Sequence, residues 1–178
     1  MGDLDVHLDR LEESPDDAQA LSAVEEIYTH ENRLGDLAKL YDSLASRVQP
    51  TIAANLWMRG AKLYIDSLQQ PVQAEPYLKQ ALHADPADQE ASGLLRKLYL
   101  ERGAVSECVE LHEKELRSQV ASPQVSDGWV EIATLCVDRL NDHGRALNAL
   151  EEAITADGLN PEPYHVRGLI HDERGRPR

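Results

Sequence analysis

The chain has 178 residues, of which 42% are hydrophobic but only 4% aromatic, and phenylalanine is absent. Its formal net charge of −14 argues against nucleic acid as a partner, because binding to phosphates depends on Lys and Arg side chains. No apolar run reaches the length of a membrane span, and Asp3 and Asp5 stand where a signal peptide carries basic and apolar residues. We therefore expect a cytoplasmic protein whose core, built mainly from Leu, Ala and Val, favours closely packed helices.

Apolar residues recur at helical spacing along the whole chain, and no stretch keeps the two-residue alternation of a half-buried strand. The pattern predicts an all-α fold. The expected helices lie near residues 3–13, 17–31, 33–48, 52–68, 71–84, 87–101, 104–119, 124–140, 143–156 and 161–174. The residues that separate or end them are Pro15, Asn32, Pro50, Pro71, Pro86, Gly103, Pro123, Gly144, Gly158 and Gly175.

The sequence repeats itself at an interval of 71 to 72 residues, which indicates a modular architecture. "WMRGAKLYIDSL", beginning at Trp57, lies over "WVEIATLCVDRL", beginning at Trp129, and further matches follow in the same register. The other half of the interval also matches, with Asn32 lying over Gly103. Asn and Gly are the residues that most readily adopt the left-handed geometry that ends a helix, so both positions are expected to end one.

The repeat resembles the tetratricopeptide repeat family, whose unit of roughly 34 residues carries aromatic and small residues on its first helix and an alanine pattern on its second. The second unit matches through Trp57, Gly60, Ala61, Tyr64, Ala74, Leu78, Ala81 and Pro86. The fourth matches through Trp129, Ile132, Ala133, Cys136, Ala146, Leu150, Ala153 and Gly158, and the final helix supplies Tyr164, Arg167, Gly168 and His171. Small residues let two helices approach closely, and large ones fill the space between helix pairs.

The first and third units depart from this pattern. Glu25 and Arg96 stand where a small residue is expected, and Leu21 and Ser92 replace the aromatic residue. Other helical-pair repeats, such as the half-a-repeat types of RNA-processing scaffolds, are therefore the alternative.

The resemblance implies one domain over residues 1–178, a right-handed superhelical solenoid of antiparallel helix pairs. About four complete pairs, near 17–48, 52–86, 87–120 and 124–158, are flanked by single helices at 3–13 and 161–174. The chain thus runs from a second helix to a first helix, half a unit out of phase. We expect either a fragment of a longer repeat protein or terminal helices exposed to a partner or a second copy.

Sequence patterns that carry chemistry are missing. There is no glycine-rich phosphate loop, no Gly-x-Ser-x-Gly and no His-Glu-x-x-His. The histidines are scattered, and Cys108 and Cys136 fall at apolar helix positions, where reduced core cysteines are expected. We predict neither catalysis nor a bound metal or cofactor.

In the resembling family, the first helices of successive units line a concave groove that holds peptides or extended segments of partner proteins. Carried over by position, the groove residues are Gln19, Ser22, Glu26, Thr29, Asn55, Met58, Arg59, Lys62, Ile65, Glu90, Gly93, Lys97, Leu100, Asp127, Val130, Thr134 and Val137. Some family members grip a C-terminal carboxylate with Lys, Asn and Arg residues spread over three units. This chain does not reproduce that set, because Glu26, Ser22 and Thr134 stand there.

The candidate partner-binding residues are Asn55, Met58, Arg59, Lys62 and Lys97, a basic spot in an acidic protein. Salt bridging between helices is one interpretation of this spot, and recognition of an acidic peptide is the other. The prediction is a non-catalytic module that binds a peptide or partner protein in its groove. The alternative is an assembly segment of a longer repeat protein that associates through its terminal helices, end to end with itself or within an array.

Overall fold

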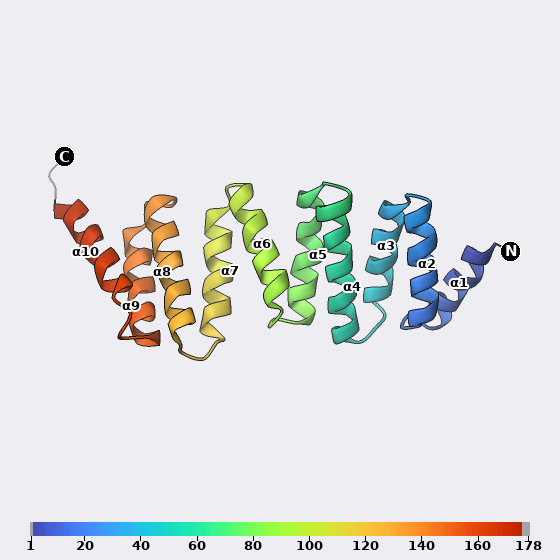
Figure 1. Ribbon diagram of the computed structural model, residues 1–178, viewed down its shortest axis with the longest axis horizontal. Helices are drawn as coiled ribbons and strands as arrows, with labels where there is room; N and C mark the ends of the chain where they lie inside the picture. Colours follow the sequence, from blue (N-terminus) through green and yellow to red (C-terminus); the bar gives the residue numbers. More distant parts are fainter. Residues whose placement is uncertain (1, 176–178) are drawn as a thin grey trace. The chain divides into compact units, whose positions relative to one another are not determined.

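The computed structural model describes residues 2–175, with side chains through Asp172. Its backbone forms α-helices, one π-helical turn and no β-strand in that range, which confirms the all-α prediction of helix pairs (Figure 1). The elements are α1 (Asp3–Glu13), α2 (Ala18–His30), α3 (Leu34–Ala45), α4 (Pro50–Lys62), a π-helical turn (Leu63–Ser67), α5 (Pro71–Ala84), α6 (Gln89–Glu101), α7 (Val105–Arg117), α8 (Pro123–Asp138), α9 (His143–Ala156) and α10 (Glu162–Gly175).

Local residue chemistry accounts for where the helices begin. The Asp17 carboxylate accepts hydrogen bonds from the backbone N–H groups of Gln19 and Ala20, both at 3.0 Å, and so caps α2. Asp142 caps α9 in the same way. Pro50 and Pro71 occupy the first position of α4 and α5, where the missing N–H of proline leaves no hydrogen bond unmade.

The turn inside each helix pair contains one residue with a positive φ. Asn32 has a φ of 55° between α2 and α3, and Gly103 has 78° between α6 and α7, which confirms both as helix-ending positions. Gln69, at 53°, and Asn141, at 52°, play the same part before α5 and α9. The left-handed residue lets the backbone reverse within a short turn, and it recurs in all four pairs whatever side chain stands there.

The end of α4 differs from the expected helix over 52–68. The helix begins at Pro50, and after Lys62 it widens into the π-helical turn Leu63–Ser67. There the backbone N–H of Leu68 donates to the carbonyl of Leu63, at 2.9 Å. A π turn accommodates one residue more than an α turn, and Gln69 then reverses the chain.

The structure divides into two compact units, Met1–Leu98 and Tyr99–Arg178, with the boundary inside α6. In the first unit, α4 and α5 pack as a close pair in which Ala61, Ala74, Leu78 and Ala81 are fully buried. Gly60 makes this approach possible, because a Cβ atom added there would lie 2.5 Å from the ring of Tyr77. A second core cluster joins α1, α2, α3 and the start of α4.

The second unit is built around α8 and α9. Ile132, Ala133, Cys136 and Leu150 are fully buried there, and Trp129 is 3% exposed. These are the positions that the repeat pattern assigned to the inside of a helix pair. That the whole chain forms a single domain stays a prediction. Among the described residues, no helix has both the length and the apolar character needed to cross a membrane.

Candidate functional site

A hollow of about 260 Å³ opens in the first unit between α4 and the start of α6. We call it the α4–α6 hollow. Its lining residues are Thr51, Ala54, Asn55, Met58, Arg59, Lys62, Asp85, Asp88 and Glu90. Helical spacing places Asn55, Met58, Arg59 and Lys62 on one face of α4, so four of the five candidate partner-binding residues border the same space.

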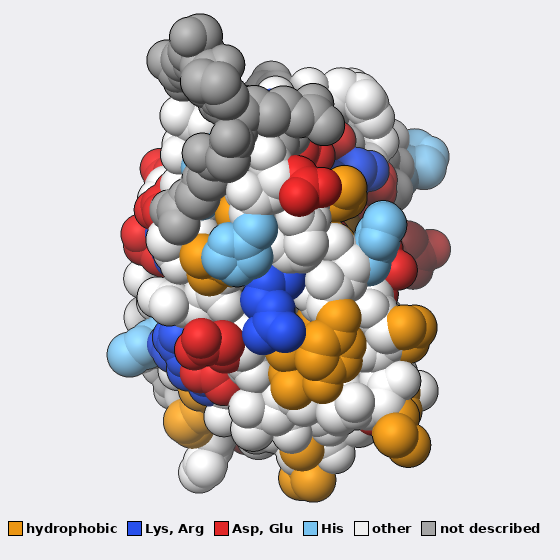
Figure 2. Space-filling model, turned by 90° about the vertical axis from the view of Figure 1, so that its left-hand side faces the viewer, with side chains coloured by type: hydrophobic (Ala, Val, Ile, Leu, Met, Phe, Trp, Pro, Cys, Tyr) orange, Lys and Arg blue, Asp and Glu red, His pale blue; other side chains and the backbone are white. Residues whose placement is uncertain are grey.

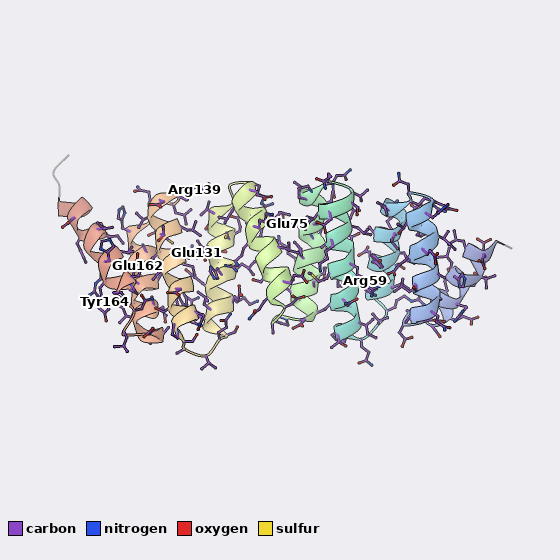
Figure 3. All side chains as sticks on the ribbon, viewed as in Figure 1. Arg59, Glu75, Glu131, Arg139, Glu162 and Tyr164 are labelled. Carbon is purple, nitrogen blue, oxygen red and sulfur yellow. The ribbon has the colours of Figure 1, made fainter. Side chains whose placement is uncertain are left out.

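Arg59 holds α4 against the first helix pair. It projects from α4 (Figure 3), and its Nη1 donates to Oε1 of Glu25 on α2, at 2.6 Å. The hydroxyl of Tyr41 donates to the same oxygen, at 2.7 Å. The Glu25 carboxylate thus joins three helices, α2, α3 and α4. This contact accounts for a glutamate at a position where the repeat pattern expects a small residue.

The pKa values of Tyr41 and Arg59 reflect this contact. Burial, and then the hydrogen bond to Glu25, raises the pKa of the Tyr41 phenol well above its ordinary value. Burial alone would lower the pKa of the Arg59 guanidinium, but the hydrogen bond and negative charge of Glu25 outweigh it, and the pKa is raised. Arg59 stays charged and Tyr41 stays neutral at any physiological pH.

Lys62 forms the second contact across the hollow. Its Nζ lies 2.7 Å from Oε1 of Glu90 on α6, and the two side chains are 46% and 60% exposed. The two cations are about equally exposed, since Arg59 is 47% exposed, but the carboxylate that pairs with Arg59, that of Glu25, is only 25% exposed. Exposed ion pairs contribute little to stability, so Lys62 is the cation that can exchange partners most easily.

The floor and rim of the hollow differ in character. Met58 is only 7% exposed and Ala54 is 6% exposed, so they form an apolar floor. Asn55 is exposed, with an amide that can both donate and accept. On the rim, Asp85 accepts from the backbone N–H of Ala87, and Asp88 accepts from that of Ala91, each at 3.0 Å.

Other predicted groove residues lie elsewhere. Lys97, two helical turns beyond Glu90 on α6, is not among the residues that line the α4–α6 hollow. Glu26 borders a separate hollow of about 430 Å³ between α1 and α2. In the second unit, Asp127 accepts a hydrogen bond from Asn160, and Val130 and Val137 pack partly buried against the core.

Sequence reasoning missed four residues of the hollow, namely Thr51, Ala54, Asp85 and Asp88. Thr51 and Ala54 lie on α4 with Asn55, four residues and one residue before it, respectively. The loop residues carried a usable signal, because Asp88 follows Pro86 immediately before a helix, the position of a capping carboxylate.

The second unit has a hollow of its own, of about 260 Å³, beside α7, α8 and α9. Its charges are largely paired, since Glu113 accepts from Arg145 at 2.8 Å and lies 3.5 Å from Arg117. Arg117 also lies over the ring of Trp129, at 5.4 Å from its centroid. This arrangement ties three helices together. Among the described residues, no three metal-ligating side chains converge on one point.

Comparison with known proteins agrees with this architecture. Residues 67–124 match the tetratricopeptide repeat family. The match extends from the end of the π-helical turn through α5, α6 and α7 to the start of α8. It therefore includes the pair α6 and α7, where Ser92 and Arg96 depart from the tetratricopeptide pattern.

The solved structure of MamA shows a similar fold. MamA aligns with a TM-score of 0.50 at 15% sequence identity, covering 85% of each chain. YrrB, a TPR protein with an unusual peptide-binding site, aligns with a TM-score of 0.47 at 16% identity, covering 93% of this chain and 81% of its own. No curated protein matches the sequence. Tetratricopeptide repeats are the fold of protein–protein interaction and scaffold modules.

Proposed function

We propose that this tetratricopeptide repeat protein is a non-catalytic interaction module that binds an extended segment of a partner protein in the α4–α6 hollow. One observation carries the proposal. Asn55, Met58, Arg59 and Lys62, chosen from the repeat register, border a single open hollow that has an apolar floor and a polar rim.

The floor and Asn55 suit an extended peptide. A peptide backbone presents N–H and C=O groups, and the exposed amide of Asn55 can donate to one and accept from the other. A small apolar side chain of the ligand would lie on Met58 and Ala54. Recognition of this kind fixes the direction of the segment while leaving much of its sequence free.

Lys62 supports an acidic residue in the ligand. A carboxylate arriving in the hollow can take Lys62 from Glu90, because that exposed pair is held weakly. Arg59 has the other role, since its contacts with Glu25 and Tyr41 hold three helices together. The two interpretations of the basic spot are therefore divided between the two cations, with salt bridging at Arg59 and recognition at Lys62.

Peptides selected from a random 12-residue display library on the intact chain test the proposal. Selected peptides should carry an acidic residue, and their affinity, measured by fluorescence anisotropy, should fall about tenfold or more in Asn55→Ala and in Lys62→Glu. Lys114→Glu, on the exposed surface of α7, makes the same change in net charge and should leave the affinity within about twofold. Equal losses in Lys62→Glu and Lys114→Glu would show that only net charge matters, and would reject the hollow as the site.

A further inference from the structure

The last described helix leaves open a face that its counterpart buries. Tyr164, Gly168 and His171 on α10 stand 35 residues after Trp129, Ala133 and Cys136 on α8, the repeat positions that face the second helix of a pair. Trp129 is 3% exposed, and Ala133 and Cys136 are fully buried. Tyr164, in contrast, is 43% exposed, and Gly168 and His171 are also exposed.

The helix that covers this face on α8 is α9. It contributes Ala146, Leu150 and Ala153, all fully buried in the same core as Trp129. Their spacing, alanine, leucine four residues later and alanine three residues after that, places them on one side of a helix. The second unit thus contains both the covered form of this face and the pattern that covers it.

On α10 the other side of the helix is already used. Pro163 and Ile170 are buried against the second unit, and Val166 packs partly against its core. Leu169, 51% exposed, extends the apolar surface beside the open stripe. Figure 2 shows this end of the molecule, with apolar side chains next to basic and histidine side chains around α10.

Two features keep the face accessible. The Arg167 guanidinium lies 5.4 Å from the centroid of the Tyr164 ring, and the Tyr164 hydroxyl donates to the carbonyl of Gly158, at 3.4 Å. Both interactions hold the ring near the start of α10, where Figure 3 labels it. A Cβ atom added to Gly168 would meet nothing within 4 Å, so the space above this glycine is empty. A large ring beside an open glycine forms a groove into which the side chains of another helix can pack.

The first helix of a second copy does not fit this groove. Asp3, His7 and Arg10 on α1 stand 71 residues before Ala74, Leu78 and Ala81, the buried face of α5. The corresponding face of α1 therefore lacks the small-large-small pattern of α9.

We propose that the open face of α10 binds an amphipathic helix of a partner protein that presents the small-large-small pattern of α9. The bound helix lies along α10 as α9 lies along α8, with its leucine between Tyr164 and Gly168. This surface is separate from the α4–α6 hollow and takes a helix where the hollow takes an extended segment. The two binding proposals are independent, so either can hold without the other.

The test uses the intact chain and a fluorescein-labelled synthetic peptide of residues 142–157, which carries the α9 pattern. Anisotropy should rise with protein concentration and saturate. The same peptide with Leu150→Asp should bind at least about tenfold more weakly, because it would bury a charge. In the protein, Gly168→Gln should also weaken binding of the original peptide about tenfold or more, because its side chain fills the empty space.

Gly35→Gln, on α3, is the matched control. Gly35 also has nothing within 4 Å of an added Cβ, so both variants should fold, which circular dichroism verifies, but Gly35→Gln should bind the peptide within about twofold of the unchanged chain. The proposal is overturned if the peptide does not saturate or if the two glycine variants lose affinity equally. It is also overturned if sedimentation shows that the unchanged chain self-associates and Gly168→Gln does not, because a second copy would then occupy the face.

Discussion

Replacing Gly60 by alanine is expected to destabilise the first unit, although alanine is the better helix former. The reason is the ring of Tyr77, whose Cδ1 and Cε1 atoms would lie 2.5 and 2.7 Å from the new Cβ atom. That ring cannot move aside freely. It lies edge-on to Trp57, with centroids 5.6 Å apart, and against Tyr64 at 5.3 Å, and its hydroxyl donates to the carbonyl of Ala38.

The magnitude follows from two opposing terms. Alanine in place of glycine in a helix interior contributes about 1 kcal/mol of stability. Overpacking of a close helix contact costs about 1–3 kcal/mol, and a contact nearly 1 Å too short at a confined ring favours the upper part of this range. We therefore expect a net loss of roughly 1–2 kcal/mol in the free energy of unfolding.

Gly93→Ala separates the two terms. Gly93 lies inside α6 in the same unit, and an added Cβ there meets nothing within 4 Å, so only the helix-propensity gain of about 1 kcal/mol is expected. Urea unfolding followed by circular dichroism, together with fluorescence of Trp57, measures both variants. If Gly60→Ala gained as much stability as Gly93→Ala, the close approach of α4 and α5 through Gly60 would be refuted.

Three further outcomes are expected. Leu150→Ala should lower the free energy of unfolding by about 2–5 kcal/mol in thermal or urea unfolding, because the side chain is fully buried, whereas Leu169→Ala, at 51% exposure, should cost well under half as much. Burial first, followed by the hydrogen bond to Glu25 for Tyr41 and by the charge of Tyr64 for Tyr77, raises both pKa values in the folded chain. Stability is therefore complete below the ordinary tyrosine pKa of about 10 and falls as the pH rises above it. Urea midpoints that stay constant from about pH 9 to about pH 11 would contradict this. Burial also raises the pKa of the Cys136 thiol to about 11, so peptide mapping after iodoacetamide treatment should find it unmodified in the native chain and modified in urea.

The helices could be predicted from the sequence because their signals are local. Apolar spacing and breakers such as Pro50, Pro71 and Gly103 place each helix to within a few residues. The π-helical turn after Lys62 could not be predicted, because the longer hydrogen bonds that define it leave no pattern of residue types. Gln69 escaped notice for a related reason, since glutamine is not a residue that indicates a left-handed turn.

The candidate site was predictable only in part. Asn55, Met58 and Lys62 share a helix face, which spacing alone reveals. Helical spacing cannot reveal the residues of the opposite rim, since Asp85 comes from a separate loop. The contact between Arg59 and Glu25 joins residues 34 positions apart, and nothing in either segment indicates the partner. Sequence therefore located the α4 wall of the hollow and Glu90 on the opposite side, and the fold supplied Asp85 and Asp88.

The four positive-φ residues show that the repeat is kept in the backbone geometry of its turns. The residues at these turns are Asn, Gln, Gly and Asn, yet each of them has a positive φ. The residue type at such a turn can vary as long as it tolerates the left-handed geometry, whereas a β-branched residue would strain the turn. Distant members of such an array can thus be recognised by aligning backbone geometry at the turns, even after the letters of the sequence no longer agree.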